Sequence, residues 1–437
     1  MARTTFPQET RAAKAPRRGA PLLAAWVVAG LLLAACGGGS SPSAGTRIVT
    51  NGSGAVGFGV LSCFTGILAP LGRAMLQGSQ VAQRVIDAQG GVLGKQLALT
   101  HADTGCNTTD APPAARQLLN SDHAVGIIGP ETDDVASVIP IITRARVPTE
   151  FQGGGAFFDH NTNPYLWRDS PSDSLLAVAM ALHASKSGYT TGANLFYSNA
   201  GGQSFAKPIT ATFQKLGGRI VDNVTVTPDL SSYRSQLQQL VAARPQVIFT
   251  QTDAATAATI FRDLSALNGS GIHVVGSDVT ASGEYLKAIT YPVAHARLVS
   301  IYGTSVTGPA ADAFNQAFTQ TFGSGVQPLA NANYAYDAVI SLALAIDRAG
   351  TTDGSSVVKV MKQVTNPPGT ACYTYESCLK LVHQGKKINY EGASGDLNYD
   401  RYNNVFGAYG AFRATLSGDE EQVESLSASE LAAATPS

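Results

Sequence analysis

Apolar and polar positions alternate between two kinds of segment along most of the chain. Short apolar runs bounded by glycine, proline or polar residues indicate buried β-strands. Between these runs, apolar residues recur at the spacing of an amphipathic helix. The first such helix is predicted from Leu71, Ala74, Met75, Val81, Ala82, Val85 and Ile86. Strands that alternate with helices predict an α/β fold with parallel strands and right-handed crossovers.

The expected strands fall into two series of similar order and spacing. Strands of the first series are expected at Val56–Leu61, Gln96–Thr100 and Val125–Ile128. Strands of the second series are expected at Ala193–Ser198, Ile220–Val226, Val247–Thr250 and His273–Gly276. Later strands are expected at Leu298–Thr304, Gly392–Tyr399 and Val405–Phe412. This repetition predicts two Rossmann-like lobes with a ligand cleft between them.

Residues 125–173 combine the features of a ligand-binding wall. An apolar strand ends at Gly129-Pro130, and a polar turn then opens an amphipathic helix. A second strand begins near Val147 and runs into three glycines, Gly153, Gly154 and Gly155. Ligands of open α/β sheets bind outside the carboxyl ends of the strands, where such loops lie. We interpret this stretch as one half of a small-molecule cleft.

Composition narrows the class of protein. The chain has 437 residues, enough for two domains, and 44% of them are hydrophobic. Charged residues make up only 14%, and the net charge is −1. A chain without a basic field does not attract nucleic acid, so no nucleic-acid partner is expected.

The N-terminal segment has the pattern of an export signal. Basic residues precede an apolar run that is too short, and too closely followed by glycines, for a membrane span. Leu33-Ala34-Ala35-Cys36 looks like a lipobox, which predicts a signal peptide over residues 1–35 and lipidation of Cys36. A plain secretory signal with an incidental cysteine is the alternative, and Arg17-Arg18 leaves the export route open. Residues 36–46 are expected to form a flexible tether.

Export places the remaining four cysteines in an oxidising compartment. Four cysteines allow three connectivities. Cys63 and Cys106 follow apolar runs in neighbouring strand–helix loops, whereas Cys372 and Cys378 are close in sequence. We therefore expect the disulfides Cys63–Cys106 and Cys372–Cys378, and no metal site, because no CxxC pair or histidine ligand spacing exists.

The chain lacks the signatures of cofactor and catalytic sites. Residues 52–57 spell GxGxxG, but these glycines lie within the first strand instead of following it, so no dinucleotide cofactor is expected. No GxSxG, HExxH or telling Cys-His spacing is present. The sequence therefore favours a binding protein over an enzyme.

Several motifs, taken in order, resemble type I periplasmic solute-binding proteins of the branched-chain amino acid class, the receptors of ABC importers. The matching residues are Thr65-Gly66, residues 88–95, Ile128-Gly129-Pro130, Val147-Pro148, residues 164–168, residues 171–174, Gly217-Gly218, residues 276–278, residues 336–338 and residues 392–400. The resemblance implies two lobes joined by three crossovers, which close over a ligand. It implies that residues 47–172 with 299–367 form lobe 1 and that residues 173–297 with 368–415 form lobe 2. The composition of residues 416–437, acidic, rich in serine and alanine and low in large apolar residues, predicts a frayed tail.

The resemblance also implies ligand-binding positions. The Thr132 hydroxyl would donate to a ligand carboxylate at a helix N-terminus, or Thr132 and Asp133 would only cap that helix. Asp133, like Glu131, adds negative charge where the carboxylate would sit, which argues against a simple carboxylate ligand unless these side chains turn away. Gly153, Gly154 and Gly155 would offer backbone amides. Asp173 and Asp278 would pair with an ammonium group of the ligand. The alternative for Asp173 is that it caps a helix, and the alternative for Asp278 is that it is a solvent-exposed acid in a loop. Further candidates are Thr65, Gln203, Ser204, Asp253 and Tyr336.

Departures from the family pattern leave the ligand open. Leu71-Gly72 and Gly201-Gly202 stand where aliphatic amino-acid binders carry tyrosines, and Glu131 adds a negative charge beside Thr132. The implied function is delivery of a small polar solute, an amino acid or amide-like compound, to an ABC permease. The alternative is a sensor of the same fold that signals through a membrane partner. A monomer is expected, exported and lipid-anchored on the outer face of a bacterial cytoplasmic membrane.

Overall fold

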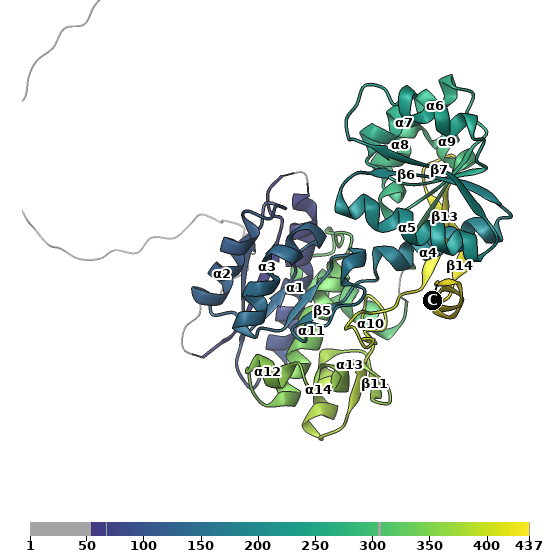
Figure 1. Cartoon of the computed structure of the whole chain (residues 1–437). Coiled ribbons are helices and arrows are strands. Elements are labelled where there is room, and N and C mark those ends of the chain that lie inside the picture. Colours follow the sequence, from purple (N-terminus) through teal and green to yellow (C-terminus); the bar gives the residue numbers. More distant parts are fainter. Residues whose placement is uncertain (1–53, 67, 305–306, 437) are drawn as a thin grey trace, which may run out of the picture. The chain divides into compact units, whose positions relative to one another are not determined.

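The computed structural model describes residues 54–66, 68–304 and 307–436 (Figure 1). The side chains of Asp133 and Ala200 are outside this description. Cys36 and the predicted signal peptide and tether also lie outside the described residues.

Lobe 1 is built on a five-stranded parallel sheet with the strand order β2-β1-β3-β4-β5. Its strands are β1 (Val56–Ser62), β2 (Leu97–Asp103), β3 (Gly126–Ile128), β4 (Thr149–Phe151) and β5 (Leu166–Arg168). Four of them, β1, β3, β4 and β5, are buried along their whole length. Strands buried on both faces form continuous apolar runs, which explains why β1, β3 and β4 were expected from the sequence. Strand β5 was not expected, since Leu166-Trp167-Arg168 forms no apolar run of its own.

Helices from two separate parts of the chain, residues 69–145 and 309–383, complete lobe 1. They are α1 (Ala69–Ala88), α2 (Ala111–Asn120), α3 (Thr132–Ala145), α10 (Pro309–Phe322), α11 (Ala332–Ala349), α12 (Gly354–Val357), α13 (Met361–Thr365) and α14 (Tyr375–His383), with the 3-10 turn η1 (Ala156–Phe158). A parallel pair, β11 (Thr370–Cys372) and β12 (Ile388–Tyr390), lies beside α14. Figure 1 shows these green segments gathered with the purple and blue ones.

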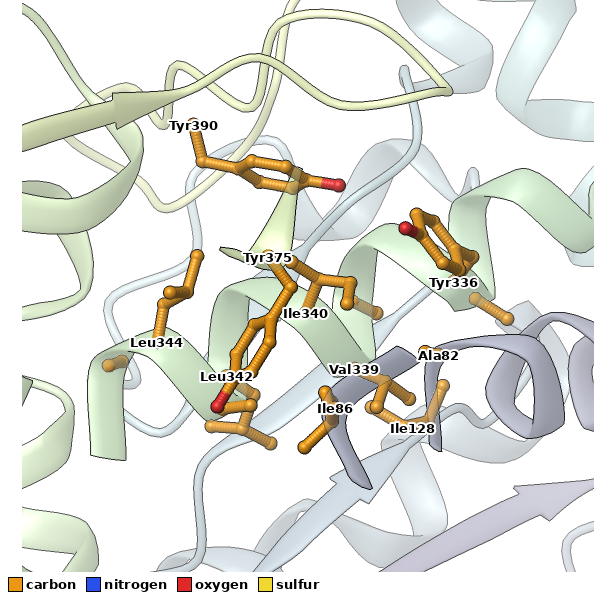
Figure 2. Packing of buried hydrophobic residues seen from close by; sticks show 14 of the residues in the cluster. Ala82, Ile86, Ile128, Tyr336, Val339, Ile340, Leu342, Leu344, Tyr375 and Tyr390 are labelled. Atoms are coloured by element: carbon orange, nitrogen blue, oxygen red, sulfur yellow. The ribbon is translucent and has the colours of Figure 1, made fainter. Parts of the chain in front are cut away.

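Helix α11 lies at the centre of the lobe 1 core. Buried side chains surround it, among them Ile86 from α1, Ile128 from β3 and Tyr375 from α14 (Figure 2). A Cβ at Gly78 of α1 would lie 1.8 Å from the carbonyl oxygen of Ala332, so only glycine permits this close approach of the two helices. The core of lobe 1 therefore depends on segments more than 200 residues apart in the sequence.

Lobe 2 is built on a seven-stranded sheet with the order β14-β13-β10-β9-β8-β6-β7. Its strands are β6 (Thr191–Tyr197), β7 (Arg219–Val226), β8 (Val247–Gln251), β9 (His273–Gly276), β10 (Leu298–Gly303), β13 (Tyr409–Ala414) and β14 (Glu420–Leu426). Strands β6 to β10 are parallel, and β13 and β14 add antiparallel pairs at one edge.

Helices also cover the sheet of lobe 2. They are α4 (Asp173–Lys186), α5 (Ala200–Lys215), α6 (Arg234–Ala242), α7 (Ala254–Ala266), α8 (Gly283–Ile289), α9 (Tyr291–Arg297) and α15 (Ala428–Ala434), with the 3-10 turn η2 (Asp278–Ala281). The chain passes between the lobes three times, after β5, after β10 and before β13. This is the expected α/β fold of two Rossmann-like lobes with three crossovers.

The structure differs from the expected lobe boundaries at β10. This strand pairs with β9 and β13 of lobe 2, so the second crossing follows Gly303 instead of preceding Val299. An apolar run fits either sheet equally well, and its periodicity does not indicate which one it joins. The region after α11 remains with lobe 1 through α14 and β12, beyond the expected limit at residue 367. The expected strand at Gly392–Tyr399 is instead a loop, because the Asp337 carboxylate accepts hydrogen bonds from the backbone of Ala393 and Ser394.

The C-terminal segment is ordered, although its acidic and polar composition predicted a frayed tail. Strand β14 pairs with β13, and Ser427 and Glu430 form a capping box at the start of α15. Glu424 lies 2.6 Å from both His183 Nδ1 and Lys186 Nζ of α4. The ion pair with Lys186 and the hydrogen bond with His183 dock the segment on lobe 2, and composition alone does not reveal such partners.

Candidate ligand-binding cleft

A cavity of about 550 Å³ opens at the carboxyl ends of the parallel strands and is lined by both lobes. From lobe 1 its polar lining residues are Glu131, Gln152, Gly154, Asn331, Asn333, Tyr334 and Ser394. From lobe 2 and the first crossover they are Ser170, Asp173, Asp278, Ser282, Tyr302, Thr304, Tyr409 and Glu420. A cavity of this volume suits a small ligand, and its position is the usual one for an α/β binding protein.

The glycine loop after β4 forms one wall of this cavity. The backbone N–H of Asp173 donates to the carbonyl of Gly154 at 2.7 Å. A Cβ at residue 154 would lie 2.0 Å from Oδ1 of Asp173, so glycine is required for this approach. Arg168 supports the loop from behind, because its guanidinium donates to the carbonyls of Gly154 and Gly155 and forms an ion pair of 2.6 Å with Asp159. The loop is therefore held in place and is not a loose connector.

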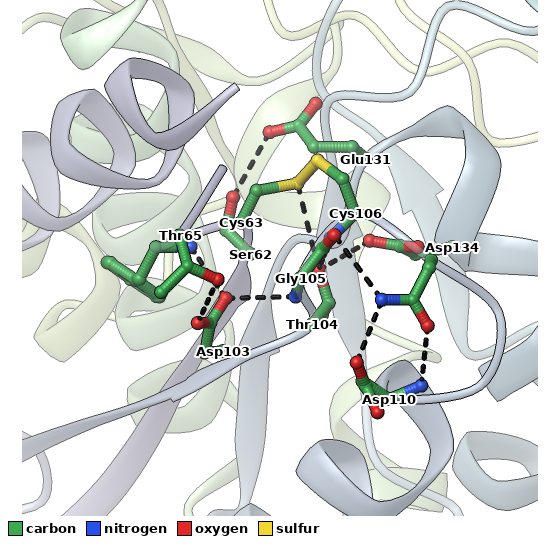
Figure 3. The surroundings of a disulfide bond; sticks show 12 residues. Ser62, Cys63, Thr65, Asp103, Thr104, Gly105, Cys106, Asp110, Glu131 and Asp134 are labelled. Carbon is green, nitrogen blue, oxygen red and sulfur yellow. Dashed lines mark hydrogen bonds between the residues drawn. A yellow bond between two sulfur atoms is a disulfide. The ribbon is translucent and has the colours of Figure 1, made fainter. Parts of the chain in front are cut away.

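Glu131 precedes α3 at the next wall (Figure 3). The Ser62 hydroxyl donates to its carboxylate at 3.3 Å. Burial raises the pKa of Glu131 to about 7, and the negative charge of Asp134 adds to this effect. At neutral pH this carboxyl is poised between its neutral and charged forms, and a nearby cation would favour the charged form.

A disulfide supports the loops behind Glu131. Cys63 and Cys106 are bonded, with their Cα atoms 5.0 Å apart. The Thr104 hydroxyl donates to Asp134 at 2.5 Å, which joins this disulfide region to α3 (Figure 3). The second disulfide, Cys372–Cys378, joins β11 to α14 with its Cα atoms 5.4 Å apart. The structure therefore contains both expected disulfides.

Further buried carboxyl groups lie in lobe 1 behind the cleft. Glu150 accepts hydrogen bonds from Ser341 at 2.6 Å and Tyr399 at 2.8 Å, and burial raises its pKa to about 8. Burial raises the pKa of Asp337 to about 6. Burial and the charge of Glu150 raise the pKa of Asp169 well above its ordinary value. Carboxyl groups are therefore present in the interior of lobe 1 as well as on the surface of the cleft.

The structure places three of the expected site residues in the lining, namely Gly154, Asp173 and Asp278. Asp278 is solvent-exposed within the cleft, yet the surrounding protein raises its pKa. Thr132 begins α3 directly behind the glycine loop, and added Cβ atoms at Gly153 and Gly155 would meet it at 3.0 and 2.9 Å. Asp133 follows in α3, and its side chain lies outside the described part of the chain.

The other five expected residues lie away from the lining and have structural partners. Thr65 is exposed and donates to Asp103, and Tyr336 packs edge-to-face on Phe314 in the lobe 1 core. Asp253 caps α7 and accepts from the Tyr197 hydroxyl. Gln203 is exposed on α5 and donates to the Tyr197 carbonyl at 2.8 Å. Ser204, also on α5, accepts from the Ala156 N–H at 3.3 Å, a contact between the two lobes.

The aromatic residues of the lining were not predicted from the sequence. Tyr302 is the last residue but one of β10, Tyr334 lies in the first turn of α11, and Tyr409 begins β13. The acid Glu420 begins β14 in the segment expected to fray. These residues come from separate elements that only the crossovers bring together. Their common signal, a tyrosine near one end of an element, is too weak to identify a site from sequence.

Comparisons with known proteins agree with this geometry. The sequence pattern of the periplasmic binding protein family matches residues 55–373, most of the chain. The chain belongs to the periplasmic binding protein family. This family binds small-molecule ligands, works with ABC transporters and acts outside the cytoplasm.

Individual relatives are distant. Leu/Ile/Val-binding protein homolog 3 of Brucella melitensis is 25% identical over 347 residues, which cover 78% of this chain and 86% of that protein. Glutamate receptor 2.4 of Arabidopsis thaliana is 23% identical over 330 residues. These cover 70% of this chain but only 34% of the receptor, so the chain spans about a third of that protein.

Solved structures share the fold. A leucine-binding protein, LivK, of Thermotoga maritima superposes with a TM-score of 0.69 at 20% identity, covering 85% of this chain and 98% of that one. At this identity the likeness establishes the type I binding-protein fold and leaves the ligand undetermined. Within the described residues, no helix has the length and apolar character needed to span a bilayer.

Proposed function

We propose that this family member is the extracytoplasmic substrate-binding lipoprotein of an ABC transporter. It binds a small polar solute by closure of the two lobes and delivers the solute to a permease. The observation that carries the proposal is the cavity lined by both lobes, with the glycine loop on one side and Asp278 on the other. A ligand that touches both walls favours the closed arrangement, because only that arrangement offers both sets of contacts.

Amino acids and amide-like compounds are the first candidates for the solute, because the Thermotoga neighbour is a leucine-binding protein and the Brucella relative is named a homolog of a Leu/Ile/Val-binding protein. Asp173 and Asp278 are the residues proposed to bind an ammonium group of the ligand. The backbone amides around Gly154 are proposed to bind the polar groups of the ligand. Thr132, Gly153 and Gly155 support this wall from behind. The solute is tested directly by mass spectrometry of small molecules released when gently purified protein is denatured. Calorimetry against amino acids, amides and small carboxylates then measures affinity, and heat-silent titrations throughout would contradict solute binding.

Lipidation of Cys36 is part of the proposal and rests on the Leu33-Ala34-Ala35-Cys36 motif. Cells fed radiolabelled palmitate should label the wild-type chain and leave Cys36→Ser unlabelled. The wild-type protein should sediment with membranes, whereas Cys36→Ser should be released or retain its signal peptide. Equal labelling of both chains would refute the prediction that Cys36 is lipidated.

The similarity to a plant glutamate receptor favours a second candidate, a sensor that signals through a membrane partner. The two functions differ in their partner. Cross-linking of the ligand-loaded protein in intact cells should capture the transmembrane subunits of an ABC permease. Capture of a signalling protein in their place would favour the sensor.

A further inference from the structure

The cleft is lined by negative charge from both lobes. Four carboxyl groups face it, from Glu131 before α3, Asp173 at the start of α4, Asp278 in η2 and Glu420 in β14. Among the residues that the structure describes, no lysine, arginine or histidine lines this cavity. Several carboxylates around one cavity repel each other, and an opposite charge between them relieves that repulsion.

A further carboxyl group, that of Asp169, is buried behind the wall of the cleft. Its side chain is only 2% exposed, and neither carboxylate oxygen has a hydrogen-bond partner on another residue. The charge of Glu131 contributes to raising the pKa of Asp169, and the charge of Asp169 raises the pKa of Tyr334, so this carboxyl lies close to two residues that line the cleft. A buried carboxyl without a partner is costly and usually neutralises itself or meets a cation. Burial raises the pKa of Asp169 well above its ordinary value, and a cation in the cleft would favour its charged form, as it would for Glu131.

The neighbouring cation Arg168 is already engaged elsewhere. Its guanidinium forms the ion pair with Asp159 and donates to the carbonyls of the glycine loop. The N-terminus of α3, the natural place for a ligand carboxylate, is preceded by Glu131. An acid at that position opposes a second carboxylate, because the two negative charges would share one helix end.

Three tyrosines complete the lining. Tyr302, Tyr334 and Tyr409 all face the cavity, and the Tyr302 hydroxyl donates to Glu420 at 3.1 Å. The charges of Asp173 and Asp278 both act on Tyr409, which places this tyrosine near the acids of the crossover and of lobe 2. Aromatic faces attract ammonium and guanidinium groups, so rings interleaved with carboxylates suit an organic cation.

From these observations we infer that the cleft binds an aliphatic amine with two or more ammonium groups and no carboxylate. One ammonium meets Glu131 on lobe 1, and the other meets Asp278 and Glu420 on lobe 2, so a diamine draws the two lobes together. This inference rests on the proposed function and narrows its solute from amino acids and amides to a class of net positive charge.

A matched pair of ligands tests the inference. Lysine and 1,5-diaminopentane differ only in the α-carboxylate, so calorimetry with the purified protein isolates the effect of that group. The diamine should bind at least about tenfold more tightly than lysine, the difference expected from one unfavourable charge contact. Leucine and acetamide should bind more weakly than either cation.

Variants of the lining residues test which carboxyl groups bind the ammonium groups of the diamine. Asp278→Asn and Glu420→Gln should each weaken diamine binding by about tenfold or more, because each removes a charge-assisted contact. Glu421→Gln is the matched control, since Glu421 is adjacent on β14 and does not line the cavity. Circular dichroism and thermal melting establish that each variant is folded.

The outcomes separate this inference from the proposed function. Binding of leucine, acetamide or lysine in preference to the diamine would overturn the inference and leave a solute receptor in place. Diamine binding that Asp278→Asn and Glu420→Gln leave unchanged would also overturn the assignment of the cleft. An absence of binding by every compound would count against both the inference and the proposed function.

Discussion

At the scale of single residues, buried carboxyl groups connect the segments of lobe 1. Glu150 of β4 is held by Ser341 of α11 and by Tyr399, which lies beyond β12. Its pKa of about 8 means that it is largely protonated at neutral pH. Burial therefore costs less than it would for a charged carboxylate, but only while the proton stays in place.

This proton predicts a pH dependence of stability. The folded-state pKa of Glu150 is raised from 4.5 to about 8, so its contribution is complete below pH 4.5 and is lost as the pH rises through 8. One such group lowers the free energy of unfolding by up to about 1.4 kcal/mol per pH unit within that window. Urea unfolding of the ligand-free protein at pH values between 5 and 9 measures the slope.

Two variants separate the contribution of Glu150 from that of the other buried acids. Glu150→Gln resembles the neutral carboxyl and should flatten the curve between about pH 5 and 8, the measured part of the window in which Glu150 contributes to the slope. Glu421→Gln, at an exposed position, should leave the curve unchanged. A Glu150→Gln curve parallel to that of the wild-type protein would show that Glu150 does not carry the extra proton.

At the scale of elements, the two disulfides constrain loops of very different length. Cys63–Cys106 closes a loop with a sequence separation of 43 that includes α1 and β2, whereas Cys372–Cys378 closes one with a separation of 6 between β11 and α14. Only the first joins two strand–helix loops that support the cleft wall. The two bonds should therefore differ in their contribution to stability.

We predict that Cys63→Ala with Cys106→Ala lowers the free energy of unfolding by about 4 kcal/mol, against about 2 kcal/mol for Cys372→Ala with Cys378→Ala, because a longer closed loop restricts the unfolded chain more. Urea unfolding without reductant measures both values. Mass mapping after alkylation verifies that the remaining disulfide is intact in each double variant. Equal losses would indicate that loop closure is not the main contribution.

At the scale of the whole molecule, three crossovers let two lobes share one ligand. We predict that a saturating ligand reduces the radius of gyration in solution scattering, because closure brings the lobes together. Asp278→Asn should retain the ligand-free radius and require more ligand for the same compaction. Saturation without any change in radius would contradict binding by closure.

The architecture of the molecule was largely predictable from sequence, and the lining of its cleft was only partly so. Alternation of apolar runs and helical spacing indicated both lobes, because these patterns report burial directly. Gly154 and Asp278 were found because they lie within contiguous motifs. Tyr302, Tyr334 and Glu420 were missed because they meet only after the chain has crossed between lobes. Conversely, Asp253 was a candidate for ligand binding but caps helix α7. An aspartate is equally suited to either role, so the sequence alone does not separate them.

The three crossovers also determine the order in which the lobes are completed during synthesis. Lobe 1 begins with β1 but lacks α11 until residue 349 has been made, after β6 to β10 of lobe 2. Lobe 2 in turn lacks β13 and β14 until nearly the last residues emerge. Neither lobe can bury its core early, since Ile86 and Ile128 await partners more than 200 positions downstream. Both lobes of a chain assembled in this way therefore remain incomplete for most of its synthesis.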